Sequence, residues 1–322
     1  MKRLIWVVTL GLLIVLSGCS PLAHKTHRFS SIASESSSVQ QKSKSAKPKV
    51  TPWNVTKTKQ LSNFMHEWQT KMNQAYTGTY DNGKPTHYGA AFPEAFSNGE
   101  LKGRVQWLGQ SIDLAWSPKG DQLDAFQVVA VATSKTMFLT TYFFTLHDQR
   151  PVVFYTQTTN GDHLLVQDTQ NIELQRGFAK IATGTTVVPR SDAELNTEVE
   201  QSVEANPQQI PKAYRRDWYY YSNYEHRPVK LPLTDERGIK LAYYENATPK
   251  WLNVRGSTQT AGAGSDFYLR YKFYDGRQIP VMMLASGAAA WFDGNAYQTA
   301  ALAQRFQEYR FGDEPKTREE DQ

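Results

Sequence analysis

The chain has 322 residues, of which 40% are hydrophobic and 12% aromatic, and it carries a formal charge of +5 and a single cysteine. This composition excludes a collagen-like chain, a wholly disordered chain and a scaffold of disulfides. The length is sufficient for two domains of ordinary size, each with its own core.

The N-terminal residues have the pattern of an export signal. Two basic residues precede an apolar run from Leu4 to Leu16, which is shorter than the roughly 20 residues that span a bilayer. The sequence Leu-Ser-Gly-Cys that ends at Cys19 resembles the lipobox of bacterial lipoproteins. This resemblance implies removal of a signal peptide, residues 1–18, and attachment of a diacylglycerol to the sulfur of Cys19. We therefore expect a protein held by lipid on the extracellular face of the cell membrane.

The segment after the lipobox has the composition of a tether. Residues 20–50 contain nine serines, six basic residues and one acid, with too few apolar side chains to offset the entropy of ordering. We assign 19–50 to the lipidated cysteine and this tether. Residues 51–322 then hold 28 basic and 30 acidic residues, a charge of −2, so the folded part is slightly acidic. This charge and the extracellular location argue against nucleic-acid binding. The basic tether either contacts anionic membrane or wall groups or serves as a spacer.

The first folded segment, 51–188, begins with an amphipathic helix. Apolar residues recur at helical spacing between 56 and 76, where Asn54 or Thr56 is the expected N-cap and Gly78 the expected stop. Six strand-like runs and a helix at about 169–182, ended by Gly184, follow. The strands are expected at 104–107, 112–116, 125–133, 137–146, 152–156 and 163–166, with a hairpin at Asn160-Gly161 and 125–133 as a central strand. The order predicts an α+β domain whose helices pack on one face of an antiparallel sheet.

This segment resembles a known family. The resemblance is carried by Trp53 and by the pattern Leu61-x-x-Phe64-Met65-x-x-Trp68-x-x-x-Met72-x-Gln74-x-Tyr76. It covers about 52–185 and is similar to the domain-of-unknown-function 4767 family, which occurs in surface lipoproteins of Gram-positive lactic-acid bacteria. The resemblance implies a location in the cell envelope and a fold class, and it implies no activity or catalytic residue.

An acidic connector joins this segment to the rest of the chain. A capping box from Ser191 to Glu194 begins a short helix with a narrow apolar stripe, within 189–209. We expect this helix to lie across a surface between two domains.

The second folded segment, 210–312, is rich in tyrosine, since twelve of the 17 tyrosines follow residue 212. Strands are expected at 217–222, 229–233, 239–244, 251–255, 267–273, 279–284 and 289–292. Turn signals such as Asp275-Gly276 and Asp293-Gly294 separate them, which predicts a small, mostly-β barrel or roll. A helix at 297–310 and a charged, frayed tail at 313–322 complete the chain. The segment from 208 to 312 resembles a recurrent C-terminal module of such lipoproteins.

Motifs for catalysis or metal binding are weak throughout the sequence. It contains no Gly-x-Ser-x-Gly elbow, Walker loop, His-x-x-x-His pair or Asp-rich calcium loop. His147-Asp148 and Asp162-His163 are adjacent in strand-like runs, so their side chains point to opposite faces. His66 lies on the polar side of the first helix, where we expect it to be solvated. We expect no cofactor and no metal site.

The aromatic residues of the second segment are the remaining candidates for function. Tyrosine and tryptophan can stack on sugar rings or hold peptides, although they also fill half-buried positions of a sheet. The candidate binding residues are Trp218, Tyr219, Tyr220, Tyr221 and Trp251. We expect a non-catalytic binding or scaffolding protein of the cell envelope, whose partner is a cell-wall polymer, a sugar or a peptide. Two alternatives stay open: a hydrolase acting on peptidoglycan or wall polymer, and a lipocalin-like barrel that holds a small apolar ligand.

Overall fold

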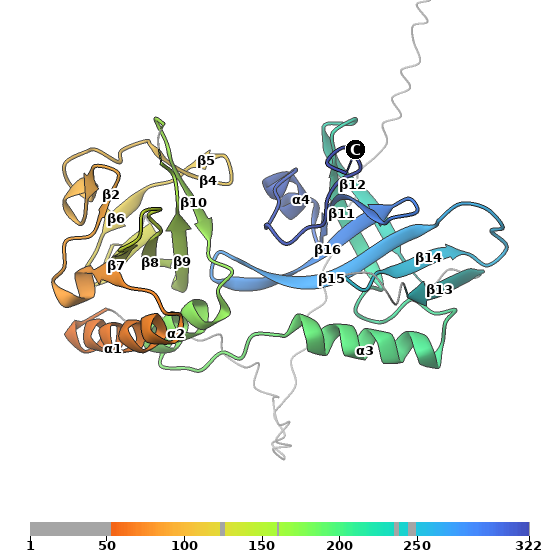
Figure 1. Cartoon of the computed structure of the whole chain (residues 1–322), viewed down its shortest axis with the longest axis horizontal. Helices are drawn as coiled ribbons and strands as arrows, with labels where there is room; N and C mark the ends of the chain where they lie inside the picture. Colours follow the sequence, from red (N-terminus) through yellow and green to blue (C-terminus); the bar gives the residue numbers. More distant parts are fainter. Residues whose placement is uncertain (1–52, 123–125, 160, 235–237, 244–248, 322) are drawn as a thin grey trace, which may run out of the picture. The chain divides into compact units, whose positions relative to one another are not determined.

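The computed structural model describes residues 53–122, 126–159, 161–234, 238–243 and 249–321 (Figure 1). These residues fall within one compact unit of the chain. The signal peptide, Cys19 and the tether lie outside the described residues. Within the described part, no helix is long and apolar enough to cross a membrane. The fold class is α+β, as expected, with two helices and a first sheet followed by an antiparallel second sheet.

Helix α1 (Val55–Lys71) begins where the sequence predicts. The Asn54 side chain accepts a hydrogen bond from the backbone N–H of Lys57 at 3.0 Å, which is the expected N-cap. Three residues of the apolar stripe are almost completely buried: Leu61, Met65 and Trp68.

The predicted end of this helix at Gly78 is wrong. Asn73 has a φ of 51°, a left-handed conformation that stops a helix as a glycine would. The backbone N–H of Tyr76 then donates to the side chain of Gln69 at 2.7 Å, and Tyr76 begins strand β1 (Tyr76–Gly78). The apolar residue at 76 therefore continues the core as a strand residue.

The first sheet has the strand order β1-β7-β8-β9-β10-β4-β5, with β6 paired to β7. Its other strands are β4 (Val105–Trp107), β5 (Gln110–Ser111), β6 (Leu114–Trp116), β7 (Phe126–Ser134), β8 (Thr141–His147), β9 (Arg150–Thr156) and β10 (Leu164–Asp168). The run from β7 to β10 is the predicted antiparallel meander. However, β4 is parallel to β10 and β6 is parallel to β7. The segment between β1 and β7 crosses the sheet, so these short strands enter it in the same direction as their neighbours.

The crossing segment contains smaller elements. Strands β2 (Thr86–His87) and β3 (Ala90–Ala91) pair with each other. The 3-10 helices are η1 (Thr79–Asp81) and η2 (Glu94–Phe96). The predicted hairpin between β9 and β10 is antiparallel, with Tyr155 opposite Gln167. This register leaves a connection longer than the two-residue turn that we predicted, and Asn160 of that turn lies outside the described residues.

Both helices of this region cover the same face of the first sheet, as expected (Figure 1). Helix α2 (Ile172–Thr183) ends at Gly184, which takes the left-handed conformation of a C-cap with a φ of 72°. Phe178 packs with residues of α1 and of β7–β9, and the segment before β7 covers the opposite face. All nine residues of β7 are buried, which confirms its central position.

The second sheet contains all seven predicted strands in the order β12-β11-β17-β16-β15-β14-β13. They are β11 (Arg216–Ser222), β12 (Arg227–Leu233), β13 (Ile239–Tyr243), β14 (Leu252–Gly256), β15 (Ser265–Tyr274), β16 (Arg277–Ser286) and β17 (Trp291–Tyr297). Every pair is antiparallel. Within the described part of the chain, β12 and β13 form the two edges of the sheet and do not pair with each other, so the sheet is a half-barrel.

The acidic helix α3 (Asp192–Ala205) is more than a connector. Its three apolar residues Leu195, Val199 and Val203 are buried in one cluster with side chains from all seven strands of the second sheet. Its expected cap is present, since Ser191 Oγ accepts a hydrogen bond from the N–H of Glu194 at 3.4 Å. The helix thus supplies the core of the half-barrel.

The C-terminal residues also pack on the second sheet. Helix α4 (Ala300–Phe306) is shorter than predicted, because Tyr297 still belongs to β17 and Gln307 has a φ of 47°. The tail is not frayed, since Glu314 is fully buried and forms an ion pair with the equally buried Arg270 of β15. Burial would raise the pKa of Glu314, but Arg270 and the hydrogen bonds it accepts hold that pKa below its usual value.

Candidate functional site

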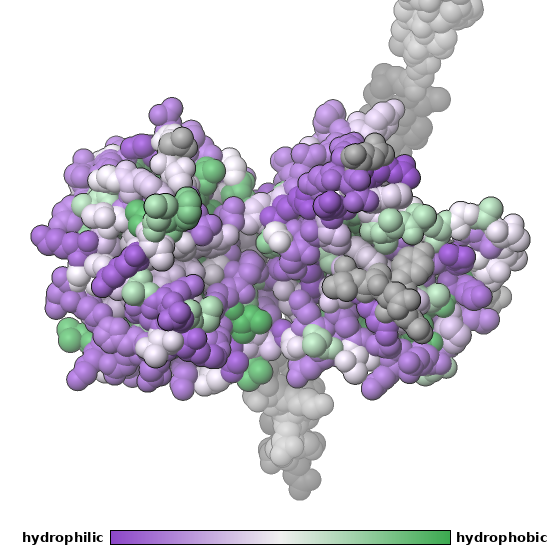
Figure 2. Space-filling model, viewed as in Figure 1, coloured by the Kyte–Doolittle hydropathy of each residue, from purple (hydrophilic) through white to green (hydrophobic). Residues whose placement is uncertain are grey.

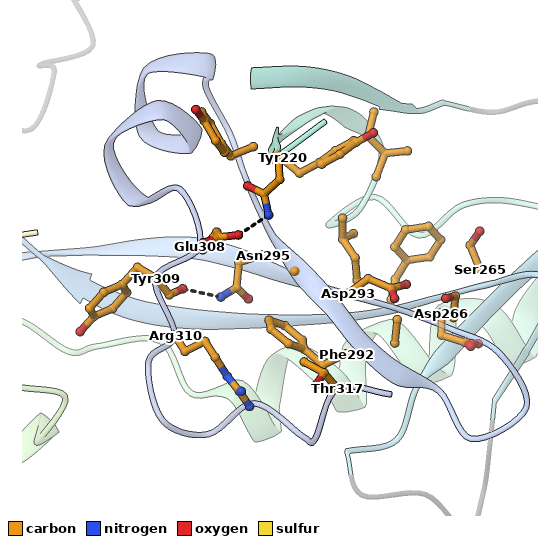
Figure 3. Close-up of a pocket in the computed structure, with 18 of the residues that line it drawn as sticks. Tyr220, Ser265, Asp266, Phe292, Asp293, Asn295, Glu308, Tyr309, Arg310 and Thr317 are labelled. Carbon is orange, nitrogen blue, oxygen red and sulfur yellow. Dashed lines mark hydrogen bonds between the residues drawn. The ribbon is translucent and has the colours of Figure 1, made fainter. Parts of the chain in front are cut away.

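A pocket of about 470 Å³ lies where strands β11 and β17 separate (Figure 3). The two strands pair at only two positions, Tyr219 with Tyr297 and Tyr220 with Ala296. The pairing of β16 with β17 changes register between Leu284 and Ala285 of β16, where β17 has an extra residue. Gly294 pairs with Leu284 beside this bulge, and a Cβ atom on Gly294 would meet no other atom within 4 Å. The bulge and the missing side chain together leave the pocket open.

Aromatic rings and polar groups both line this pocket. The aromatic residues are Tyr220, Tyr221, Phe267, Phe292 and Tyr309. The charged residues are Asp266, Asp293, Glu308 and Arg310, and the amides are Asn223, Asn295 and Gln307. They come from β11, β15, β17 and the segment after α4, so the site depends on contacts between distant parts of the chain.

The hydrogen-bond donors of three prominent polar side chains are already used within the protein. Asn223 donates to Glu308, and Asn295 donates to the carbonyl of Tyr309 at 3.2 Å (Figure 3). Arg310 donates to Glu320 at 2.6 Å and to the carbonyl of Pro315 at 2.9 Å. These groups shape the pocket and offer little to a ligand that needs donors.

The acceptors of the pocket are less completely used. Asp266 is fully buried, and its Oδ1 accepts a hydrogen bond from Asn253 at 2.6 Å. Its Oδ2 is also buried and has no hydrogen-bond partner among the described residues. Burial raises the pKa of Asp266, the bond from Asn253 lowers it, and the nearby charge of Asp293 raises it again. Asp293 itself is exposed at the mouth of the pocket. The site is therefore rich in acceptors.

The five candidate binding residues divide into two groups. Tyr220 and Tyr221 line the pocket, whereas Tyr219 packs beside it against the α4 core. Trp218 is completely buried, with its Nε1 donating to the carbonyl of Tyr214 at 2.9 Å, and Trp251 is 2% exposed in a small core cluster. The two tryptophans fill cores and are not available for stacking on a ligand. Cys19, the expected lipid attachment site, lies outside the described residues.

Several pocket residues were missed from the sequence. Asp293-Gly294 was interpreted as a turn between strands, but both residues lie inside β17. A glycine within a strand can mark a bulge or an opening instead of a turn, so Gly294 was the signal from which the opening could have been predicted. Asp266 gave a weaker signal, because it is the one carboxylate on a strand that is rich in aromatic residues, and such a group loses its water when it is buried.

The histidines examined as catalytic candidates have other partners. His66 lies 2.8 Å from Asp81, and Ser62 donates to the other oxygen of the same carboxylate at 2.5 Å. The carboxylate separates the serine from the histidine, so this group lacks the Ser–His bond that activates a nucleophile. His147 contacts Asp275 at 2.7 Å and does not pair with Asp148. In the described residues no group of three or more His, Cys, Asp or Glu could hold a metal ion.

A second pair of carboxylates lies where the β15–β16 hairpin contacts the first sheet, and we call it the hairpin joint. Asp168 accepts hydrogen bonds from Trp107 Nε1 at 2.8 Å and from the N–H of Asp275 at 2.7 Å. The Asp275 carboxylate in turn contacts His147 and the guanidinium of Arg150. Burial raises the pKa of Asp168 to about 7, although its two hydrogen bonds oppose this shift. Both oxygens of each carboxylate have a partner, so the joint is a structural contact.

Exposed apolar residues do not form a second candidate surface on the face that Figure 2 shows. Hydrophobic residues there form small, separate patches within a mostly hydrophilic surface. The most exposed large apolar side chain of the described residues other than Tyr224 is Met137, at 86%, next to Phe138 in the β7–β8 connection. Scattered exposed residues of this kind are usual for soluble surfaces.

Comparison with known proteins identifies the first region only. Residues 50–182 match the model of a domain of unknown function, DUF4767. No curated protein and no solved structure matches the chain. The match ends within α2, so the pocket and the second sheet lie beyond it. The chain therefore contains a DUF4767 domain, which includes α1, the first sheet and most of α2.

Proposed function

We propose that the protein is a non-catalytic binding protein of a Gram-positive cell envelope, attached to the extracellular face of the membrane through a lipid on Cys19. Its ligand is a carbohydrate unit of a cell-wall polymer, which binds in the β11–β17 pocket. One observation carries the proposal. The pocket combines aromatic side chains with acceptors that the protein leaves partly unpaired, while the side-chain donors of Asn223, Asn295 and Arg310 are used internally.

Sugars match these properties because they have apolar C–H faces and many hydroxyl donors. Tyr220 and Tyr221 line the pocket with half-buried aromatic side chains that project to opposite faces of β11, and Asp293 offers an exposed carboxylate acceptor. The volume of about 470 Å³ falls within the roughly 300–1,000 Å³ of small-molecule sites. A peptide that binds as an added strand would need a free sheet edge, whereas β11 and β17 both lie inside the sheet.

A second candidate function is hydrolysis of the wall polymer. The observation in its favour is that a buried carboxyl group with a raised pKa, Asp266, shares the pocket with the exposed Asp293. Glycosidases use two carboxyl groups of this kind, one as an acid and one as a base or nucleophile. The two functions differ in one measurement, since a hydrolase shortens the polymer fragments with time and a binding protein leaves them intact.

The proposal is tested by titrating the chain from residue 47 onward, which forms a compact unit of its own, with soluble fragments of cell-wall polymer in a calorimeter. Tyr221→Ala removes a ring from the pocket and should weaken binding by roughly fivefold. Tyr224→Ala is the matched control, because Tyr224 lies in the turn that follows β11, is 95% exposed and does not line the pocket.

Two results would contradict the proposal. One is that the unchanged chain binds no wall fragment, and the other is that the two tyrosine variants lose affinity equally. Chromatography of the fragments after long incubation decides between binding and hydrolysis. Shortened fragments that disappear with Asp266→Asn would establish the hydrolase.

A further inference from the structure

One end of the pocket contains two carboxyl groups, Asp266 and Asp293, and no arginine or lysine of the described residues donates a hydrogen bond to either. Figure 3 shows these two carboxylates at the same end, away from Glu308 and Tyr309. Asp266 is fully buried, yet its Oδ2 has no hydrogen-bond partner among the described residues. A buried acceptor without a partner is uncommon in folded proteins, and here it leaves one oxygen of the carboxylate without a hydrogen bond in the wall of the pocket.

The nearest cations are occupied elsewhere. Arg255 lowers the pKa of Asp266 through its charge, but its Nε donates to Asn253 at 3.1 Å and its Nη2 to the carbonyl of Ala263 at 3.1 Å. Arg310, which also lines the pocket, donates to Glu320 and lies 5.4 Å from the centre of the Phe292 ring. Neither guanidinium donates a hydrogen bond to Asp266 or Asp293 in the described structure.

The surroundings strengthen the attraction of this end for a cation. The Asp266 charge is removed from water, so it acts through a lower effective dielectric than a surface carboxylate does. Asp293 adds an accessible charge beside it. The ring of Phe267 lines the same pocket, and an aromatic face also favours a cation. A neutral hydroxyl group would use only part of this arrangement.

We infer that the ligand of the pocket carries a primary ammonium group, which Asp293 contacts directly and whose charge Asp266 stabilises from the wall behind it. Together with the aromatic lining of the pocket, this selects an amino sugar with a free amine over an N-acetylated or neutral sugar. The inference rests on the proposed carbohydrate function of the same pocket and specifies the ligand further.

The test compares four probes by calorimetry on the chain from residue 47 onward: glucosamine, N-acetylglucosamine, glucose and lysine amide. Glucosamine should bind roughly tenfold more tightly than N-acetylglucosamine and glucose, because only its amine is charged. Asp266→Asn and Asp293→Asn should each reduce this preference to about twofold or less, with the affinity for glucose almost unchanged. Asn at 266 can still accept the bond from Asn253, so the variant keeps its fold, and its melting temperature verifies this.

Asp162→Asn is the matched control, since Asp162 is exposed and does not line the pocket. It should leave the preference for glucosamine unchanged. Equal affinities of the unchanged chain for glucosamine and N-acetylglucosamine would overturn the ammonium inference and leave the proposed function standing. Failure of every sugar to bind would overturn both. Tighter binding of lysine amide than of glucosamine would retain the ammonium group, assign it to a peptide and contradict the carbohydrate proposal.

Discussion

The two ends of strand β15 carry carboxylates in opposite situations. Asp275 follows the last residue of the strand and belongs to the hairpin joint, where it and Asp168 find a donor for every oxygen. Asp266 lies near the start of the strand in the pocket, where one of its buried oxygens has no partner in the described structure. Complete pairing is what a structural contact requires, whereas incomplete pairing leaves room for a ligand. The same residue type therefore occurs in two different situations at the two ends of β15.

Two glycines, Gly276 beside Asp275 and Gly294 beside Asp293, show the same contrast. Gly276 in the joint has a φ of 67°, and a Cβ atom there would lie 2.4 Å from the carbonyl oxygen of Pro151. A Cβ atom on Gly294 in the pocket would meet nothing within 4 Å. The joint is closely packed around its backbone, and the pocket is open around its backbone. Variants in the hairpin joint, at Gly294 of β17 and at the centre of β15 can test whether this difference holds.

The largest effect is expected at the centre of the strand, where Arg270 pairs with Glu314. Arg270→Met leaves Glu314 buried without its cation, which should lower the free energy of unfolding by about 3–5 kcal/mol. Urea denaturation of the chain from residue 47 onward measures this loss. The double variant Arg270→Met with Glu314→Gln should recover part of it, because no charge then remains unpaired. A loss below about 1 kcal/mol in the single variant would show that the tail does not hold this position.

This ion pair also shows which part of the structure the sequence could not reveal. The seven strands of the second sheet were predictable, because alternation and turn residues are local signals. Arg270 and Glu314 are far apart in the sequence, and the tail around Glu314 has the polar composition of a frayed end. Their pairing depends on tertiary packing, which composition does not encode.

The candidate site was predictable to a similar, partial extent. The tyrosines at 220 and 221 were identified from composition, because aromatic residues in excess are visible in a sequence. Trp218 was assigned to the same group. It shares a face of β11 with Tyr220, but it lies nearer the core cluster and is completely buried. The pocket itself exists because β11 and β17 separate after two paired positions, and such a separation between distant strands has no local signal.

A pH titration of stability tests the fully paired carboxylates of the joint. The pKa of Asp168 is about 7 in the folded chain against 3.8 in its ordinary state, so the folded protein binds more protons between these values. Raising the pH from about 4 to 7 should therefore reduce the free energy of unfolding, by an amount on the order of 2–4 kcal/mol. Asp168→Asn should remove this part of the slope, although it also loses one of the two hydrogen bonds. Identical slopes for both proteins would contradict the raised pKa.

The close packing of the joint is tested by Gly276→Ala. The new methyl group requires a left-handed backbone and would meet the Pro151 carbonyl, so a loss of about 2–3 kcal/mol in the free energy of unfolding is expected. Thermal denaturation followed by circular dichroism measures the loss. Gly161→Ala is a useful control, because Gly161 also has a positive φ, of 108°, but no atom lies near its Cβ position. An equal loss in both variants would attribute the effect to backbone strain alone.

The smallest effect on stability is expected for Gly294→Ala at the open end of the comparison. Its φ of 158° is a backbone conformation that alanine rarely adopts, but the Cβ position is free, so backbone strain alone should lower the free energy of unfolding, by about 1 kcal/mol. The methyl group enters the pocket, however, and it should weaken carbohydrate binding severalfold by occupying the space that the bulge leaves. Calorimetric titration and urea denaturation of one protein sample measure both quantities. Unchanged affinity would show that the opening between β11 and β17 does not receive the ligand.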